Sequence, residues 1–500
     1  MVSLRRTTLA VGLTAAALAL GAAGAGAASI PDTPGIGPKP PELVGSPAVP
    51  NPIAGTTVPQ HPFMAPDGRS NIHNDAYQTD AYTGPGPLGR DMTVTSTFLL
   101  GDCASVTFDS HGRIVTVCVG VTGPTLRILD PATLKTLASK TLPPRDLLTT
   151  DPTKLFGDFT GGGYFYLDEQ DRAVLATTDR HMLTVTTSDA NGAPRLTTVR
   201  DVDLNGVVAR RDKIISALPD WSGRLWFVTV DGVVGTIDRD DASVQVLRTG
   251  EHVGNSFAIG EDGGVYIATD DALYRFDAAA DGMPVVTWRQ VYDNDGTIKP
   301  GQTQAGSGTT PTLMDDGLIT ITDNADPVNV VVYQRGRDVS GDREVCRIPV
   351  FEKGASSTDN SLVVAHHSIV VENNYGYRGP TSTIGGLTTE PGLERIDVDP
   401  EAGTCTRVWH SDEISPTVVP KVSLANGLLY AYTKPKLPGL LMDQWYFTAI
   451  DWRTGETVYK QRAGNGLGFN NNYAPITLAP DGTAYLGVLG GVVRWRDATP

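Results

Sequence analysis

The chain has 500 residues, 40% of them hydrophobic, and a formal charge of −16 at pH 7. A chain of this length can bury a substantial core, and large all-β folds often exceed the usual domain size. The acidic balance argues against binding to nucleic acid or to a membrane surface, because phosphate groups repel such a chain. We therefore expect neither as a partner, and we expect a monomer.

The first 28 residues predict a secretory signal peptide. Arg5 and Arg6 precede an apolar run from Leu9 to Leu20, and small residues follow as far as a cleavage point near Ala28. The apolar run is too short to cross a membrane. Its flanks match a twin-arginine signal in part, so the pattern favours an ordinary Sec signal. It predicts a secreted, extracellular protein.

Two segments without repeats follow the signal peptide. Residues 29–66 are rich in proline and lack apolar periodicity, which predicts an extended or disordered tether. Residues 67–91 mix His, Asn, Asp and Tyr in a polar frame, and we expect an ordered lid over the domain that follows. The lid would lend His73, Asp75, Tyr77 or Asp80 to a site, with a purely structural role as the alternative.

An internal repeat fills residues 92–497. Each copy has two short apolar strands around a tight turn of Asp, Gly, Asn or His, and most copies continue into two further strands. The copies cover residues 105–118, 164–177, 215–230, 256–269, 310–322, 361–373, 421–433 and 475–488. Four strands per unit and eight units predict a single all-β propeller with eight four-stranded blades, and seven blades are the alternative.

The last copy predicts how the ring closes. Residues 475–495 hold three strands, so the final blade would keep an unpaired edge. Residues 92–100 are rich in Thr and Val and precede the first copy. We predict that they form the outermost strand of the last blade, paired with residues 491–496.

One stretch resembles a known repeat. Residues 449–459, AIDWRTGETVY, resemble the A-x-D-x-x-T-G-x-x-x-W signature of the pyrroloquinoline-quinone repeat, with Tyr459 in place of Trp. Looser versions occur at residues 396–409 and 129–137. The resemblance implies an eight-bladed, quinoprotein-alcohol-dehydrogenase-like propeller, in which the Asp and Thr-Gly close a turn and the Trp docks one blade on the next.

The same resemblance implies a quinone-dependent oxidoreductase. Those enzymes carry two adjacent cysteines beneath the quinone, and this chain has no adjacent cysteines. Shared fold alone does not transfer chemistry. We therefore expect a cofactor-free secreted relative without bound quinone.

Four cysteines in an exported chain predict two disulfides, for which three pairings exist. Cys103 and Cys118 lie at equal distances on either side of the turn Ser110-His111, so a hairpin places them opposite one another. Cys346 and Cys405 fall on the outermost strands of consecutive blades. We predict the pairs Cys103–Cys118 and Cys346–Cys405, the second of which would join two blades.

The loops between blades are expected to gather on one face and to carry any site. The ligand-binding candidates on these loops and on the lid are Asn373, Asn374, Tyr375, Asn471, Asn472 and Tyr77. The catalytic candidates are His252, His410 and Asp75.

A candidate metal site lies in one of these loops. Asp323, Asn324 and Asp326 offer oxygen atoms of the kind that calcium takes, although such residues also cap their own turns. His111, His366 and His367 fall at first hairpin turns on the opposite face, where we expect no site.

These patterns predict a secreted propeller that binds a small polar or carbohydrate-like ligand, or a protein partner, on its loop face. The alternative is a calcium-dependent, lactonase-like hydrolase at the channel mouth that uses Asp323, Asp326, His252 and His410. A quinone-dependent oxidoreductase is the third hypothesis. The usual hydrolase and nucleotide motifs are absent from the sequence, which leaves open whether the protein is an enzyme.

Overall fold

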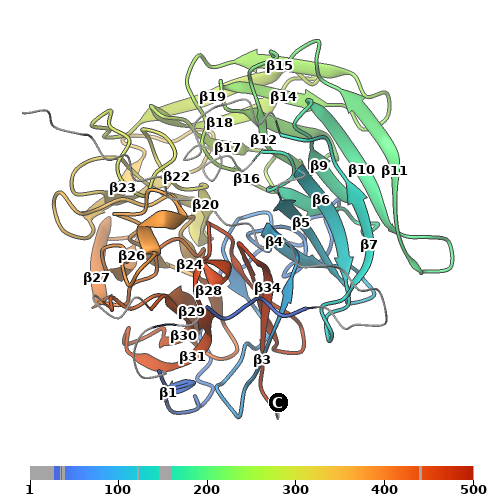
Figure 1. Ribbon diagram of the computed structural model, residues 1–500. Helices are drawn as coiled ribbons and strands as arrows, with labels where there is room; N and C mark the ends of the chain where they lie inside the picture. Colours follow the sequence, from blue (N-terminus) through green and yellow to red (C-terminus); the bar gives the residue numbers. More distant parts are fainter. Residues whose placement is uncertain are drawn as a thin grey trace, which may run out of the picture.

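A computed structural model describes residues 28–33, 35, 40–120, 123–145, 160–437 and 442–498. Its strands form eight sheets that follow one another around a ring, in chain order from the cyan blade through green, yellow and orange to red (Figure 1). The predicted signal peptide lies outside the described residues. No helix within the described ranges is long and apolar enough to span a membrane.

Each blade is a four-stranded antiparallel sheet, and its first strand lies innermost. Blade 1 consists of β4 (Gly101–Phe108), β5 (Ile114–Gly120), β6 (Gly123–Leu129) and β7 (Thr136–Thr141), and blade 2 of β8 (Phe165–Leu167), β9 (Ala173–Ala176), β10 (His181–Ser188) and β11 (Pro194–Asp203). Blade 3 consists of β12 (Ile214–Pro219), β13 (Leu225–Thr229), β14 (Val233–Ile237) and β15 (Val244–Arg248), and blade 4 of β16 (Ala258–Ile259), β17 (Val265–Ala268), β18 (Ala272–Ala278) and β19 (Pro284–Val291).

Blades 5 to 8 repeat this arrangement. Blade 5 consists of β20 (Thr312–Leu313), β21 (Leu318–Thr322), β22 (Asn329–Gln334) and β23 (Glu344–Pro349), and blade 6 of β24 (Val363–Ala365), β25 (Ser368–Glu372), β26 (Leu393–Asp399) and β27 (Thr404–Ser411). Blade 7 consists of β28 (Lys421–Ser423), β29 (Leu428–Thr433), β30 (Gln444–Asp451) and β31 (Thr457–Asn465), and blade 8 of β32 (Ile476–Leu478), β33 (Ala484–Val488), β34 (Gly491–Arg496) and β3 (Thr93–Phe98). The eight-bladed prediction is therefore confirmed.

Hydrophobic patterning explains where each strand lies within its blade. The second strand of blade 3, LWFVT in β13, is almost wholly buried because both of its faces pack against neighbouring blades. The outermost strand of blade 2, β11, alternates between half-buried and exposed residues because one face meets water. The core thus runs around the ring between adjacent blades.

The N-terminal closing strand is also confirmed. β3 pairs antiparallel with β34, with Thr93 opposite Arg496 and Phe98 opposite Gly491. Trp495 in β34 is fully buried and stacks on Phe447 of blade 7. Segments from the two halves of the sequence therefore complete one blade, and β34 is paired on both sides.

The turn within residues 449–459 lies at the joint between blades 6 and 7. The Asp451 carboxylate accepts hydrogen bonds from the backbone amides of Arg453 and Thr454 and so closes the turn. Trp409 on β27 lies against Gly455, where an added Cβ would come within 2.6 Å of the indole. Its Nε1 donates to the carbonyl oxygen of Trp452 at 2.8 Å. Trp409 thus docks blade 6 on blade 7.

Both predicted disulfides are present. Cys103 on β4 lies directly opposite Cys118 on β5, and the two are bonded. Cys346 on β23 is bonded to Cys405 on β27, which joins the outermost strands of blades 5 and 6.

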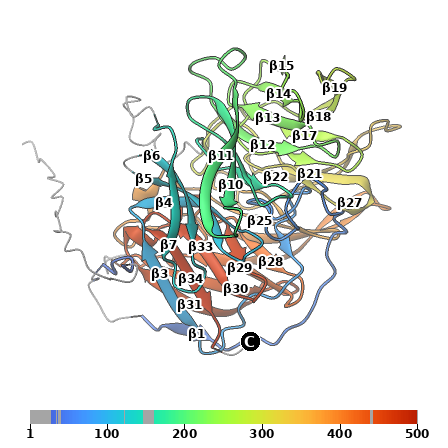
Figure 2. The ribbon, with the colours of Figure 1, turned by 90° about the vertical axis from the view of Figure 1, so that its right-hand side faces the viewer.

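The Pro-rich segment differs from the tether expected of it. Its residues 43–45 form β1 (Leu43–Gly45), which adds to the outer edge of blade 7 by pairing with β31 (Figure 2). Ile30 and Ala48 are buried in a core cluster that includes residues of blades 6, 7 and 8. Proline favours an extended backbone and is tolerated on sheet edges, so the composition that suggested a free tether also suits an added edge strand.

Candidate functional site

The polar segment before the first blade lies inside the ring. Residues 69–82, here called the channel plug, hydrogen bond to the inner strands of several blades. The backbone amides of Leu167, Ile259, Leu313 and Val364 donate to carbonyl oxygens of the plug, and β2 (Ala81–Tyr82) runs parallel to β28. These strands are two or three residues long, and the plug satisfies polar groups that they would otherwise bury unpaired.

The plug therefore lies elsewhere than the lid expected over the loop-face mouth. Leu167, Ile259 and Leu313 end their strands and lead into the first hairpin turns, so the plug closes the channel towards the face that carries those turns. Three of its residues, Asn74, Gln78 and Asp80, have φ between 59° and 63°. Left-handed backbone at such close intervals lets the segment curl within a narrow ring, at an energetic cost that the surrounding contacts offset.

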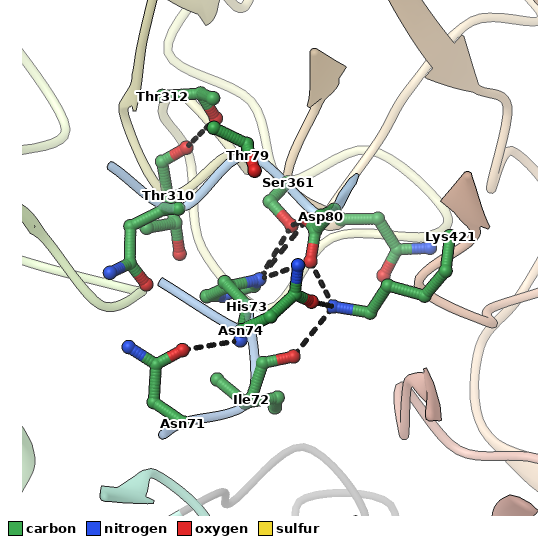
Figure 3. Close-up of polar contacts among 12 residues, drawn as sticks. Asn71, Ile72, His73, Asn74, Thr79, Asp80, Thr310, Thr312, Ser361 and Lys421 are labelled. Atoms are coloured by element: carbon green, nitrogen blue, oxygen red, sulfur yellow. Dashed lines mark hydrogen bonds and ion pairs between the residues drawn. The ribbon is translucent and has the colours of Figure 1, made fainter. Parts of the chain in front are cut away.

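A fully buried ionic network holds the plug, and Figure 3 shows its side chains converging on Asp80. The Asp80 carboxylate is bound by the Nζ of Lys421 on β28, by the Nδ1 of His73 at 3.0 Å and by the hydroxyl of Ser361 at 2.5 Å. Burial raises the pKa of Asp80, but Lys421 and His73 lower it by more, so the pKa lies below its usual value. Asp80 is thus an anion with every oxygen satisfied.

The other two plug candidates do not face the loop side. Asp75 accepts hydrogen bonds from the amide and hydroxyl of Thr79, and burial raises its pKa to about 7. The hydroxyl of Tyr77 donates to Glu261 and accepts from Arg335 at 3.0 Å, beside a first hairpin turn. Both side chains stabilise the plug.

An outer cavity of about 560 Å³ opens on the loop face, the face on which the inner strands begin. Its walls come from loops of several blades, and it has the size of an ordinary small-molecule site. Tyr473 and Tyr377 form part of its floor, with their rings edge to face at 5.5 Å.

The charged residues that line the outer cavity are all basic. They are Arg211, Lys213, Lys299 and Arg378, and no Asp or Glu lines it among the described residues. Lys299 donates to the carbonyl oxygens of Asn324 and Ala325 and lies 3.7 Å from the Asp295 carboxylate. The guanidinium groups of Arg211 and Arg378 are exposed and form no ion pair with any described residue. Among the described residues, the charged lining of the cavity is therefore positive, in a chain of net charge −16.

One of the predicted ligand-binding residues lines this cavity. Asn472 does so, although its amide also contacts Tyr377 and Asp102. The amide groups of Asn373, Asn374 and Asn471 are buried and brace neighbouring loops through hydrogen bonds. The half-buried Tyr375 lies in the same loop without lining the cavity.

The remaining predicted residues are scattered. The Asp323 carboxylate accepts from the amides of Ala325 and Asn329, and Asp326 accepts from the amide of Gly354. These bonds match the turn-capping alternative. Within the described ranges, no three His, Cys, Asp or Glu side chains are grouped to hold a metal ion.

The two catalytic histidine candidates lie apart. His252 is an exposed residue of the loop before β16, whose neighbours Val253 and Gly254 line the outer cavity. His410 lies on the outermost strand of blade 6 and pairs with Glu394 and Asp412. His366 and His367 form the tight turn between β24 and β25, opposite the loop face.

A second, smaller pocket lies deeper in the channel and adjoins the outer cavity. Asn472 and Tyr473 line both, and the inner pocket has a volume of about 20 Å³. Its wall includes His73 from the plug and Asp359 and Asn360 from the loop before β24. All three side chains are at least 94% buried.

Sequence analysis missed the basic lining and Asp359. Arg211, Lys299 and Arg378 come from loops far apart in the chain, and a lone arginine in a loop gives no signal of what it will face. Asp359 lies in SSTDNS, which reads as an ordinary turn. The polar frame around His73 was the one usable signal, and it did bring His73 to the pocket.

Comparison with known proteins gives little beyond the fold. No family model matches the chain. An uncharacterised protein from Archaeoglobus fulgidus is 30% identical over 338 residues, which make up 59% of this chain and 64% of that protein. The match thus spans less than two thirds of that relative's length.

Similar solved structures are also distant. They include the computationally designed Ika8 protein (10% identity, TM-score 0.46, covering 80% of this chain and 97% of that one) and BamB from Moraxella catarrhalis (11%, TM-score 0.39, 66% and 92%). A streptogramin B lyase gives 10% identity and a TM-score of 0.38, covering 81% and 97%. The class of this protein, an eight-bladed β-propeller, rests on its own eight sheets.

The residues present do not fit the quinone that the repeat resemblance implies. All four cysteines are used in bonds between separate strands, Cys103–Cys118 and Cys346–Cys405, so no pair of adjacent cysteines underlies the channel. We derive no chemistry through a quinone.

Proposed function

We propose that this protein is an exported binding propeller that takes a small anionic, polar ligand in the outer cavity of its loop face. The observation that carries the proposal is the lining of that cavity, with four basic side chains and no described carboxylate in a chain of net charge −16. Exposed guanidinium groups that pair with no described carboxylate suit carboxylate or phosphate groups, which they bind with paired hydrogen bonds.

The net charge of −16 disfavours the general binding of small anions to this chain. A confined group of basic side chains therefore both concentrates such anions and fixes where they bind. Tyr377 and Tyr473 add apolar surface for the uncharged part of the ligand. The two disulfides are consistent with an extracellular location.

Binding of hexanoate, with 1-hexanol and hexylamine as matched probes, tests the proposal by ligand-observed NMR at low salt. We expect hexanoate to bind most tightly of the three monofunctional probes, and Arg378→Ala or Arg211→Ala to weaken it about tenfold. Arg195→Ala is the matched control, because Arg195 is an exposed arginine on the outermost strand of blade 2.

Two outcomes would overturn the proposal. One is hexanoate binding no more tightly than 1-hexanol. The other is an equal loss of affinity in Arg378→Ala and Arg195→Ala, which would make the effect one of net charge alone.

A further inference from the structure

The inner pocket has an unusual hydrogen-bonding inventory. His73, Asp359 and Asn360 are 2%, 6% and 2% exposed, yet the Nε2 of His73, both carboxylate oxygens of Asp359 and the Oδ1 of Asn360 have no hydrogen-bond partner among the described residues. Buried polar atoms are nearly always paired, so four such atoms on three adjoining walls need an explanation.

Three of these atoms are acceptors, namely both carboxylate oxygens of Asp359 and the Oδ1 of Asn360. His73 Nδ1 lies 3.0 Å from the Asp80 carboxylate and 3.0 Å from the hydroxyl of Ser361. The amide nitrogen of Asn360 already donates to Glu372 and to the carbonyl oxygen of Val418, which fixes Oδ1 as the free end.

The two phenol donors that line the same pocket are already used. The hydroxyl of Tyr164 donates to Asn255, and the hydroxyl of Tyr473 donates to the carbonyl oxygen of Gly301. The hydroxyl and the backbone amide of Thr303, which lines the outer cavity, approach the Asp359 carboxylate and lower its pKa, but neither makes a hydrogen bond of ordinary length to it. The pocket therefore offers a carboxylate and an amide oxygen, to which neither phenol donates.

We propose that the inner pocket binds a primary ammonium group, so that the ligand of this propeller is a small zwitterion with its ammonium group inward and its anionic group at the outer cavity. A primary ammonium group carries three donors and no acceptor, and its size is close to that of the inner pocket, which holds about one water-sized group. The negative charge of Asp359 is its counter-ion. The inference rests on the proposed function, because the basic outer cavity supplies the other half of the ligand's recognition.

The adjoining geometry supports one ligand spanning both spaces. Asn472 and Tyr473 are common to the two pockets, so a chain leaving the inner pocket passes directly into the outer cavity. The two spaces have opposite charge preferences, and together they select against simple amines and simple carboxylates. A water molecule would also fit the inner pocket, and the experiment distinguishes the two occupants.

Calorimetric titration with ω-amino carboxylates from glycine to 8-aminooctanoate, each against its carboxylate without the amino group, tests the inference. We expect at least one chain length to bind about tenfold or more tightly than its matched carboxylate. Asp359→Asn should abolish this gain while leaving binding of the simple carboxylate unchanged. Asp412→Asn, a change at an exposed carboxylate on the periphery, is the matched control and should keep the gain.

The outcomes separate the two proposals. If no amino carboxylate gains over its partner, or if Asp359→Asn keeps the gain, the ammonium site is refuted although carboxylates still bind through Arg211 and Arg378. If the carboxylates themselves fail to bind, the proposed function has failed. Circular dichroism and the unfolding midpoint of Asp359→Asn establish that the variant is folded.

Discussion

The channel plug and the inner pocket each hold a buried carboxylate, but the two carboxylates differ in their partners. Asp80 is bound by Lys421, His73 and Ser361, whereas Asp359 accepts no hydrogen bond of ordinary length from a described residue. The pKa of Asp80 is lowered, and burial raises that of Asp359 to about 7. A buried carboxylate whose hydrogen bonds come from the chain itself stabilises the fold. A buried carboxylate without such partners is available to a ligand.

The largest effect should come from breaking the satisfied network. Lys421→Met leaves Asp80 as a buried anion without its cation, and we expect the free energy of unfolding to fall by about 3–5 kcal/mol. Chemical denaturation measures this change. Lys460→Met is the matched control, because Lys460 pairs with Glu413 near the surface and its loss should cost about 1 kcal/mol or less. Equal losses in the two variants would show that the plug network is not a structural centre.

Removing the Asp359 carboxylate should change the free energy of unfolding by less than Lys421→Met does, and it should raise this free energy rather than lower it. Because the pKa of Asp359 is higher in the folded than in the unfolded state, the folded protein holds more protons between about pH 4 and pH 7, and its stability falls as pH rises through that range. Asp359→Asn removes this contribution and should raise the free energy of unfolding at pH 8 by roughly 1–4 kcal/mol.

The measurement is denaturant unfolding of both proteins at pH 4 and pH 8. Asp75 has a similarly raised pKa and is unchanged in the variant, so part of the pH dependence should remain. A variant less stable than the parent protein at pH 8 would mean that Asp359 has a stabilising partner, contrary to the comparison.

The sequence predicted what depends on local repetition. Eight turn motifs at regular spacing gave the number of blades, the missing fourth strand indicated how the ring closes, and the hairpin around Ser110-His111 set Cys103 opposite Cys118. Each of these follows from hydrogen-bond register between segments close in sequence, or from the need to pair one edge.

The sequence did not predict the features that depend on the width of the central channel. Whether residues 69–82 cover the channel or fill it depends on the width left between short inner strands, which no local pattern encodes. The same limit applies to the outer cavity, because Arg211 and Arg378 become a site through the placement of blades 3 and 6. Three of the ligand candidates, Asn373, Asn374 and Asn471, instead brace the loops, which is the ordinary use of buried amides.

The most direct test of the comparison is the proton released when a ligand binds at pH 7, measured by calorimetry in two buffers of different ionisation enthalpy. His73 and the phenol groups of Tyr164 and Tyr473 face Asp359, and the raised pKa values of both phenols keep them neutral at this pH. The ω-amino carboxylate that binds most tightly should ionise Asp359 and release about half a proton. The matched carboxylate, and any ligand binding to Asp359→Asn, should release almost none. Equal proton release by both ligands in the parent protein would contradict the assignment of the unsatisfied carboxylate to an ammonium group.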